Sequence, residues 1–160
     1  MQIRLATPAD DDAIWAIMAP IIAAGDTYAL PRDMTREAAL AYWHAEGNRV
    51  YVAELEGAVL GTYMLHANQA GGGAHVSNCG FMTAPAAAGR GVARAMCAHA
   101  LDEARRLGFR AMQFNFVVST NTRAVALWQG MGFEIVGTLP GAFEHPTEGD
   151  VDVYVMYQRL

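Results

Sequence analysis

Segments with two different hydrophobic periods alternate along this chain, and this alternation restricts the folds that it can adopt. Over Arg49–Asn68, apolar and polar residues alternate on both sides of the turn dipeptide Glu56-Gly57, which predicts a β-hairpin. After Gly91, in contrast, an alanine-rich stretch runs to Leu107 and stops at Gly108, which is typical of a helix. A chain that interleaves strands with helices in this way forms a layered α/β domain.

The other segments complete this order without internal repeats. Gly80 interrupts one expected strand, where it marks a bulge or a close approach of two backbones, and Gly71-Gly72-Gly73 is expected to be a flexible connection. Besides the hairpin, we expect strands at Ile3–Ala6, His75–Thr83, Arg110–Val118, Phe133–Thr138 and Val151–Gln158. Besides the alanine-rich helix, we expect one from the cap Thr7-Pro8-Ala9-Asp10 through Ile22, one that opens at Thr35 and buries Leu40 and Trp43, and one from about Asn121 to Gly130. The order β-α-α-β-β-β-α-β-α-β-β predicts an α/β sandwich with a mixed sheet.

Length and composition favour one domain over residues 1–160, because 160 residues with 53% apolar side chains suffice for one core. The longest apolar run, Ala13–Gly25, contains Pro20 and is too short to span a bilayer. Three aspartates precede this run, which excludes a signal peptide. Cys79 and Cys97 form no disulfide or metal-binding pattern, so we expect a reducing cytoplasm.

All 11 basic residues are arginines, and the lack of lysine excludes Schiff-base chemistry and a P-loop. With 16 acidic residues the net charge is −5, so nucleic acid is not an expected partner. This average hides a basic stretch, because residues 90–123 hold six arginines and two acids, a local charge of +4, and the rest carries −9. The basic stretch suits an anionic cofactor. The acidic remainder suits a cationic acceptor, although solubility explains it equally well.

The segment Gly89-Arg90-Gly91 lies between an expected strand and a helix, where free backbone N–H groups can bind an anion. Glycines leave room for a pyrophosphate, and Arg90 and Arg94 add positive charge. The alternative is an ordinary tight turn. A dinucleotide-binding fingerprint does not fit, because Arg94 replaces its third glycine.

Together with Asn121-x-x-Ala124-x-x-Leu127-Trp128-x-x-x-Gly132-Phe133, this segment resembles the GNAT superfamily of acyl-CoA-dependent N-acyltransferases. The acyl-CoA motif of that family, Gln/Arg-x-x-Gly-x-Gly/Ala, falls on Ala88, Gly91 and Ala93. The element order agrees over nearly the full length. The resemblance implies a GNAT-like mixed, mostly antiparallel sheet flanked by four helices, with acetyl-CoA as co-substrate and no metal. The tail from Gly137 to Pro146 resembles a bacterial subgroup typically assigned small-molecule amine substrates.

The resemblance also implies roles for individual residues. Main-chain groups of three strand residues would pair with the pantetheine arm, the residues of the glycine turn would surround the pyrophosphate, and two residues of the second motif would face the cofactor. These implied cofactor-binding residues are Phe81, Met82, Thr83, Gly89, Arg90, Gly91, Val92, Ala93, Arg94, Asn121 and Trp128.

Three positions depart from the family pattern. Ala88 replaces a Gln or Arg, so we expect weaker cofactor affinity rather than lost binding. Trp128 stands where many relatives carry a tyrosine that protonates the departing thiolate, and an indole N–H is no useful acid. Phe116 stands where relatives often place a glutamate that acts as the general base. These departures motivate the alternative of a non-catalytic acyl-CoA-binding module or sensor.

Two asparagines within apolar strand segments, Asn78 and Asn115, are candidate catalytic residues that orient the amine or an adjacent carboxylate of the acceptor. Hydrogen bonds to neighbouring backbone are the alternative. Asp26 and Tyr28, on the loop between the first two helices, and Asp152, in the last strand, are candidate substrate-binding residues. The five histidines lack metal-ligand spacing, so no metal site is expected.

The function that these observations predict is direct transfer of an acetyl group from acetyl-CoA to the amine of an amino acid or amino-acid-like small molecule, in a ternary complex. A further alternative is a protein N-terminal acetyltransferase. An open groove would favour that alternative, whereas a closed pocket would favour a small-molecule acceptor. We expect no nucleic-acid or membrane partner. A homodimer is expected only from the fold class.

Overall fold

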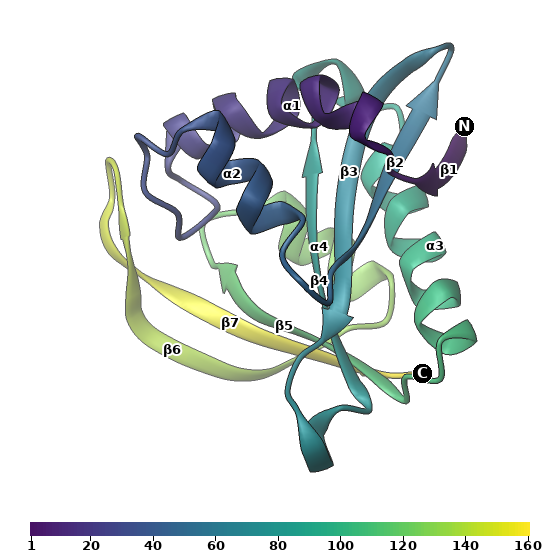
Figure 1. Ribbon diagram of the computed structural model, residues 1–160. Helices are drawn as coiled ribbons and strands as arrows, with labels where there is room; N and C mark the ends of the chain where they lie inside the picture. The colour runs from purple at the N-terminus through teal and green to yellow at the C-terminus, as the bar shows by residue number, and fades with distance from the viewer.

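The computed structural model describes residues 1–160, and its elements follow the predicted order (Figure 1). Each expected strand and helix is present, with ends that shift by a few residues. The elements are β1 (Gln2–Leu5), α1 (Asp11–Ala24), α2 (Arg36–Trp43), β2 (Arg49–Leu55), β3 (Ala58–Ala67), β4 (Val76–Thr83), α3 (Val92–Arg106), β5 (Ala111–Val118), α4 (Thr122–Gly130), β6 (Glu134–His145) and β7 (Gly149–Arg159). Short 3₁₀ turns occur at Pro8–Asp10, Gly71–Gly73 and Pro85–Ala87.

The helices begin and end where the local sequence predicts. The Thr35 side chain accepts a hydrogen bond from the Ala38 N–H and so caps α2. Thr7 and Asp10 form a capping box immediately before α1. Gly25 ends α1 with a φ of 65°, a conformation that costs glycine little.

All strands belong to one seven-stranded sheet in the order β1-β2-β3-β4-β5-β7-β6. Every neighbouring pair is antiparallel except β4 and β5, which run parallel. These two strands pair only over Val76–Asn78 and Ala111–Gln113 and then diverge. The resulting gap between β4 and β5, here called the splay, opens in the middle of the sheet.

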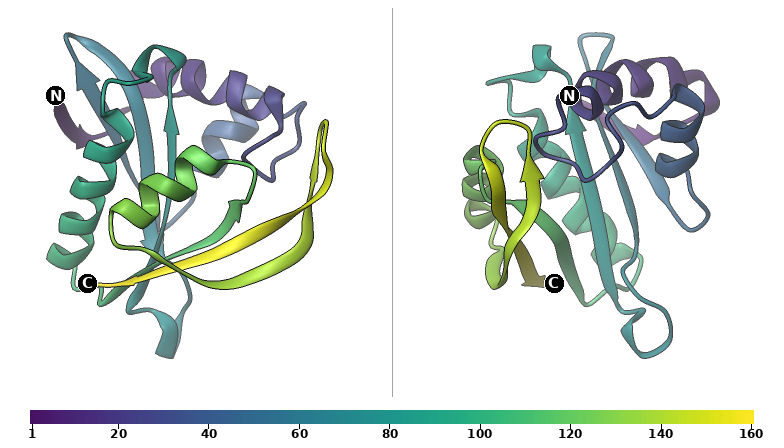
Figure 2. Two further views of the ribbon diagram at one scale, coloured as in Figure 1. Left: turned by 180° about the vertical axis from the view of Figure 1, so that it is seen from behind. Right: turned by 90° about the vertical axis from the view of Figure 1, so that its left-hand side faces the viewer.

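Helices lie on both faces of the sheet (Figure 2), and a hydrophobic core lies between the sheet and the helices on each face. On one face, α3 and α4 bury residues such as Met96 and Trp128 against β3, β4, β5 and β7. On the other face, α1 and α2 bury Ile17 and Trp43 against β2, β3 and β4. Leu40 is only half-buried, in contrast to Trp43, because Ala39 takes the fully buried position in α2.

Two expectations about local structure are wrong. The strand expected to end at Thr138 continues as β6 to His145, because Pro140 lies on an edge strand at a register shift, where its missing N–H costs no ladder bond. The triple glycine at 71–73 forms a 3₁₀ turn in which the Gly73 and Ala74 N–H groups are hydrogen-bonded, rather than a free linker. No helix is long and apolar enough to cross a membrane.

Candidate active site

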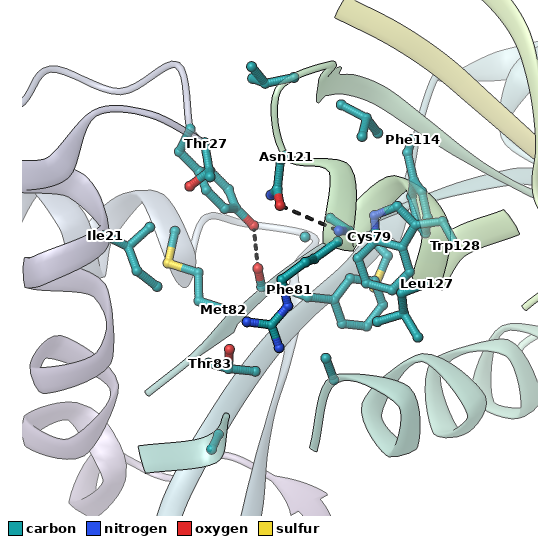
Figure 3. Close-up of a pocket in the computed structure, with 18 of the residues that line it drawn as sticks. Ile21, Thr27, Cys79, Phe81, Met82, Thr83, Phe114, Asn121, Leu127 and Trp128 are labelled. Carbon is teal, nitrogen blue, oxygen red and sulfur yellow. Dashed lines mark hydrogen bonds between the residues drawn. The ribbon is translucent and has the colours of Figure 1, made fainter. Parts of the chain in front are cut away.

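The splay opens into a cavity of about 960 Å³ that reaches from the start of α3 to the loop between α1 and α2. Its lining comes from β4, β5, the first turns of α3 and α4, and that loop. In Figure 3, Thr27 of the loop lies on one side of the cavity and Asn121, Leu127 and Trp128 lie on the other, with Phe81 between them. The cavity therefore brings together most of the residues that the sequence singled out.

The turn before α3 is built to receive an anion. Gly89 and Gly91 have φ values of 71° and 73°, and a Cβ on either residue would meet no atom within 4 Å, so both face open space. Gly91 is the N-cap of α3 but offers no side chain to cap it. The N–H groups of Gly91, Val92, Ala93 and Arg94 have no hydrogen-bond partner within the protein. Four unpaired donors at a positive helix end favour a phosphate group.

The arginines of the basic stretch do not all serve this turn. Arg94 and Arg123 line the cavity. The Arg90 side chain does not line the cavity and pairs with the exposed Glu56 at 2.7 Å, and its implied contact with a pyrophosphate stays a prediction. Arg105 and Arg106 pair with Asp102 and Glu103 in the last turns of α3. Thus two arginines, rather than six, add positive charge to the cavity.

Main-chain groups of β4 face the splay at alternate residues. The Asn68 N–H donates to the Val76 carbonyl and the Ala84 N–H donates to the Leu60 carbonyl, so even-numbered residues of β4 pair with β3. Phe81 and Thr83 therefore direct their N–H and C=O groups into the splay. Met82 instead pairs with β3, and this removes its main chain from the implied contact with a pantetheine arm.

Aromatic side chains form the wall of the cavity beside β4. The Trp128 ring lies 5.0 Å from the Phe81 ring and 5.1 Å from the Phe114 ring, measured between centroids, and only 8% of the residue is exposed. Asn121 caps α4 by accepting from the Ala124 N–H at 3.4 Å, and its amide nitrogen has no partner in the protein. Trp128 thus acts in packing, and Asn121 offers a free donor to the cavity.

The loop between α1 and α2 is tied to the edge of the splay by Tyr28. Its hydroxyl donates to the Phe81 carbonyl at 2.9 Å. A Cβ at Gly80 would lie 3.2 Å from this hydroxyl and 3.2 Å from the Met64 methyl group, so Gly80 is the expected point of close approach. Burial raises the pKa of Tyr28 far above its ordinary value, so the hydroxyl remains a donor. Asp26 is exposed on the same loop and lines the cavity.

Both candidate asparagines reach the cavity. The Asn78 amide nitrogen donates to the Gln113 carbonyl at 2.9 Å across the last paired residues of β4 and β5. Asn115 lies two residues after Gln113 in β5, and its side chain is hydrogen-bonded to Gln113 and Asn68. The expected hydrogen bond to backbone is present for Asn78, whereas Asn115 is held by side chains. Both residues border the cavity, and their contact with an acceptor stays a prediction.

Asp152 does not reach the cavity, contrary to the proposed contact with a substrate. Its carboxylate accepts from the Gly141 N–H at 3.0 Å, a contact that stabilises the bulged part of the β6–β7 ribbon. Conversely, sequence reasoning missed Arg123 and Tyr42 in the lining and Asn68 and Gln113 behind it. Two of them had a signal in the sequence: Arg123 belongs to the basic stretch, and Gln113 is a polar residue in an apolar strand like Asn115. The structure holds no cluster of three or more His, Cys, Asp or Glu side chains that could hold a metal ion.

A sheet split between a fourth and a fifth strand, with an uncapped helix at one end of the gap, defines an acyltransferase-like α/β domain. The model of the acetyltransferase (GNAT) family matches residues 15–133. The chain therefore belongs to the GNAT acetyltransferase family.

Known proteins resemble the chain in sequence and in structure. A GCN5-related N-acetyltransferase from Kribbella flavida is 47% identical, with a TM-score of 0.93, and the match covers 99% of this chain and 97% of that one. YncA from Salmonella typhimurium, solved with its cofactor acetyl-CoA, is 26% identical with a TM-score of 0.87 over 100% of this chain and 94% of its own. The N-acetyltransferase aca1 of Schizosaccharomyces pombe is 32% identical over 98 residues, 61% of this chain and 47% of that protein. The chain thus matches about half the length of this curated relative.

Proposed function

We propose that the protein transfers an acetyl group from acetyl-CoA to the amine of a small molecule, an amino acid or a similar compound, by direct attack in a ternary complex. The observation that carries this proposal is one continuous cavity that joins the anion-binding turn, the splay and the two asparagines. The turn suits a pyrophosphate, the splay suits an extended thioester arm, and the asparagines border the space left for an acceptor. Acetyl-CoA bound to YncA, a relative 26% identical in sequence, supports the choice of cofactor.

Main-chain donors carry the binding of the acyl donor in this proposal. The unpaired N–H groups from Gly91 to Arg94 hold the pyrophosphate, and the Arg94 guanidinium adds charge. The Phe81 N–H points into the splay, where it donates to the carbonyl oxygen of the acetyl group. Ala88 lines the cavity without a polar group, so these backbone donors replace the contact of the usual Gln or Arg.

The chemistry needs the acceptor amine as a free base. Burial raises the pKa of Tyr28, Tyr42 and Cys79, which line the cavity, so these groups stay protonated. No histidine or glutamate lines the cavity, and its one carboxylate, Asp26, is exposed on the loop between α1 and α2. The amine therefore loses its proton to water before attack. An indole cannot protonate the leaving thiolate, but a thiol pKa of about 8.5 makes the thiolate a good leaving group without an acid.

Calorimetry with acetyl-CoA and a CoA-release assay against amino acids, polyamines and N-terminal peptides test the proposal. We expect acetyl-CoA binding and CoA release with amino acids. Binding without CoA release for any amine would identify an acyl-CoA-binding module. Release with peptides alone would identify an N-terminal acetyltransferase, and no binding would overturn the proposal entirely.

We also propose that residues 1–160 act as one domain in a reducing, cytoplasmic compartment. The strands from β1, which starts at Gln2, to β7, which ends at Arg159, all belong to one sheet, which supports one domain. Cys79 and Cys97 are both free and buried, which supports a reducing environment.

A homodimer is part of the proposal. Val118, Phe143 and Val153 form a small cluster on the face of the sheet opposite α4, and the cluster contains no helix residue. Next to it, Phe116 is 39% exposed and Leu139 is 41% exposed. We infer that a second copy of the chain covers this apolar part of the β6–β7 ribbon.

A further inference from the structure

The two candidate asparagines belong to a connected set of side-chain amides, here called the amide cluster. It consists of Asn68, Asn78, Gln113 and Asn115. The Asn115 amide nitrogen donates to the Asn68 side-chain oxygen at 2.6 Å. The Gln113 amide nitrogen donates to the Asn115 side-chain oxygen at 2.9 Å. The Asn78 amide nitrogen donates to the Gln113 main-chain carbonyl at 2.9 Å. Three elements, the end of β3, β4 and β5, thus meet at the start of the splay.

The orientation of Asn78 is fixed by its partners. A main-chain carbonyl can only accept, so the Asn78 nitrogen must face Gln113 and its oxygen must face the His66 Nε2, 3.1 Å away. His66 lies on β3 directly opposite Asn78. Asn115 is likewise held at both ends, by Gln113 and Asn68. The cluster is therefore anchored before any acceptor arrives.

The cluster retains side-chain N–H groups that no protein atom accepts from. Asn115 and Asn78 each retain an N–H, because each carboxamide has two and uses one in the bonds above. The Asn68 amide nitrogen has no partner, and its oxygen is already occupied by Asn115. No carboxylate takes part in the cluster, and the one carboxylate that lines the cavity, Asp26, comes from the loop between α1 and α2. Because the cluster offers free N–H groups and contains no carboxylate, it suits an anionic oxygen better than an ammonium group.

We infer that the amide cluster binds the carboxylate of the acceptor through Asn78 and Asn115, which line the cavity, while Asn68 lies behind them and holds the Asn115 amide. The acceptor is then an amino acid whose amine points into the splay, toward the Phe81 main chain, while its carboxylate rests on the amides. Gln113 and His66 are positioning residues, which hold Asn115 and Asn78. This inference rests on the proposed function. The sequence left open whether the asparagines orient the amine or an adjacent carboxylate of the acceptor, and the inference selects the carboxylate.

The test compares each amino acid with the amine that lacks only its carboxylate, for example alanine with ethylamine and phenylalanine with phenethylamine. We express kcat/KM per concentration of free-base amine, so that the different amine pKa values of the two substrates do not contribute. On this scale we expect kcat/KM of the unmodified protein to be at least about tenfold higher for the amino acid, because charge-assisted hydrogen bonds are lost in the amine. N68D and N115D keep the side-chain shape and add a negative charge. Both should lower kcat/KM for the amino acid at least about tenfold and leave the value for the amine within about threefold.

Gln69 provides the matched control, because it neighbours Asn68, is exposed and lies outside the cavity. Q69E adds the same charge and should leave both substrates unaffected. Q113A should raise the KM of the amino acid more than it lowers kcat, with unchanged acetyl-CoA affinity. Equal kcat/KM values for amino acid and amine in the unmodified protein would overturn the inference, as would equal losses for both in N68D.

A failure of the proposed function is distinguishable from a failure of this inference. If no amine supports CoA release, the proposed function fails, and the inference is then tested by calorimetric binding of the same amino acid and amine pairs to the protein saturated with CoA. Tighter binding of the amino acid, weakened in N68D, would uphold the carboxylate site without catalysis. Equal or absent binding would overturn it.

Discussion

Gly91 is the residue on which binding of the anionic cofactor depends most directly. It has a φ of 73° and no neighbour at its Cβ position, so a side chain there would both strain the backbone and fill the space above the unpaired N–H groups. Gly108, at the other end of α3, has a φ of 87° and also faces open space, but it lies outside the cavity. We expect Gly91→Val to weaken acetyl-CoA binding at least about tenfold, measured by calorimetry.

Gly108→Val is the control for the strain itself. Both variants should lose about 1 kcal/mol of unfolding free energy from the positive φ, and only Gly91→Val should change the dissociation constant. Equal affinities in the two variants would remove the turn from the binding site.

The cavity lining also predicts the pH dependence of turnover. Because Tyr28, Tyr42 and Cys79 stay protonated, the proton equilibrium that limits the rate is that of the acceptor amine itself, with a pKa of about 10. We expect kcat/KM for a simple primary amine to rise about tenfold per pH unit from pH 6 to about pH 9. A plateau that begins near pH 7 would instead identify a protein base.

At the level of single residues, the sequence predicts backbone features better than side-chain directions. Gly89, Gly91 and Gly80 were recognisable because only glycine tolerates a positive φ or a close contact. Arg90 was assigned to the pyrophosphate from its position in the motif, but Glu56, thirty-four residues away in sequence, pairs with it. Asn68 had no local signal, because its role arises from a contact with Asn115 across two strands.

The loop between α1 and α2 is an element whose position depends on one hydroxyl. Tyr28 joins it to β4 through the Phe81 carbonyl, and the Tyr28 ring packs edge-on against Trp43 with 6.5 Å between centroids. We expect Tyr28→Phe to keep the packing, free the carbonyl and loosen the loop, which would raise the acceptor KM about threefold to tenfold. Hydrogen exchange of residues 25–34 should accelerate as well.

Tyr42→Phe is the control for Tyr28→Phe. Tyr42→Phe also removes a hydroxyl from the cavity lining, but one without a hydrogen-bond partner, and it should leave loop exchange unchanged. If both variants behave alike, the tie to Phe81 does not hold the loop.

The contact between α3 and β2 predicts how stability depends on pH. Glu103 accepts hydrogen bonds from Arg106 at 2.6 Å and from the Tyr51 hydroxyl at 2.5 Å, and these lower its pKa from 4.5 to about 2. A lowered pKa stabilises the folded state above pH 4.5, and the contribution disappears as the pH falls to about 2. Glu103→Gln should therefore cost about 1 kcal/mol at pH 7 and nothing at pH 2, measured by urea unfolding.

Asp102→Asn is the matched control in the same helix, because Asp102 is 81% exposed in its pair with Arg105. Its unfolding free energy should follow that of the unmodified protein at both pH values. A Glu103→Gln difference that persists at pH 2 would show that the carboxylate charge is not the cause.

At the level of elements, local signals located every helix and strand, because caps, turn glycines and alternation are encoded within a few residues. The length of β6 escaped prediction, since Pro140 normally ends a strand and only its place at the sheet edge permits it. The divergence of β4 and β5, which creates the site, depends on how seven strands twist together and has no local signal of its own.

For the whole molecule, the distribution of charge along the β6–β7 ribbon determines how two copies would pair. The ribbon tip carries Glu144, Glu148 and Asp150, all exposed. At the opposite end, Arg159 of β7 and Arg110, which directly precedes β5, border a cavity of about 280 Å³, and the exposed Glu134 of β6 lies nearby, so this end holds two arginines and one glutamate. A two-fold axis through the apolar middle places the acidic tip of one copy on the basic end of the other. The apolar contact and the charges therefore favour the same antiparallel arrangement.

Light scattering after gel filtration should give a mass near twice 17.2 kDa. Leu139→Glu places a charge in the apolar middle and should yield monomers, whereas Leu5→Glu alters an equally exposed leucine on β1, at the far edge of the sheet, and should leave the dimer intact. Arg159→Glu should weaken the dimer, and combining it with Glu148→Arg should restore it, because the exchange re-forms the pair across the axis.

Phe116 lines the acceptor end of the cavity and borders this face, so the monomeric variant should also show a raised acceptor KM with unchanged acetyl-CoA affinity. A monomeric unmodified protein would refute the dimer, and a dimer that survives Leu139→Glu would place its interface elsewhere.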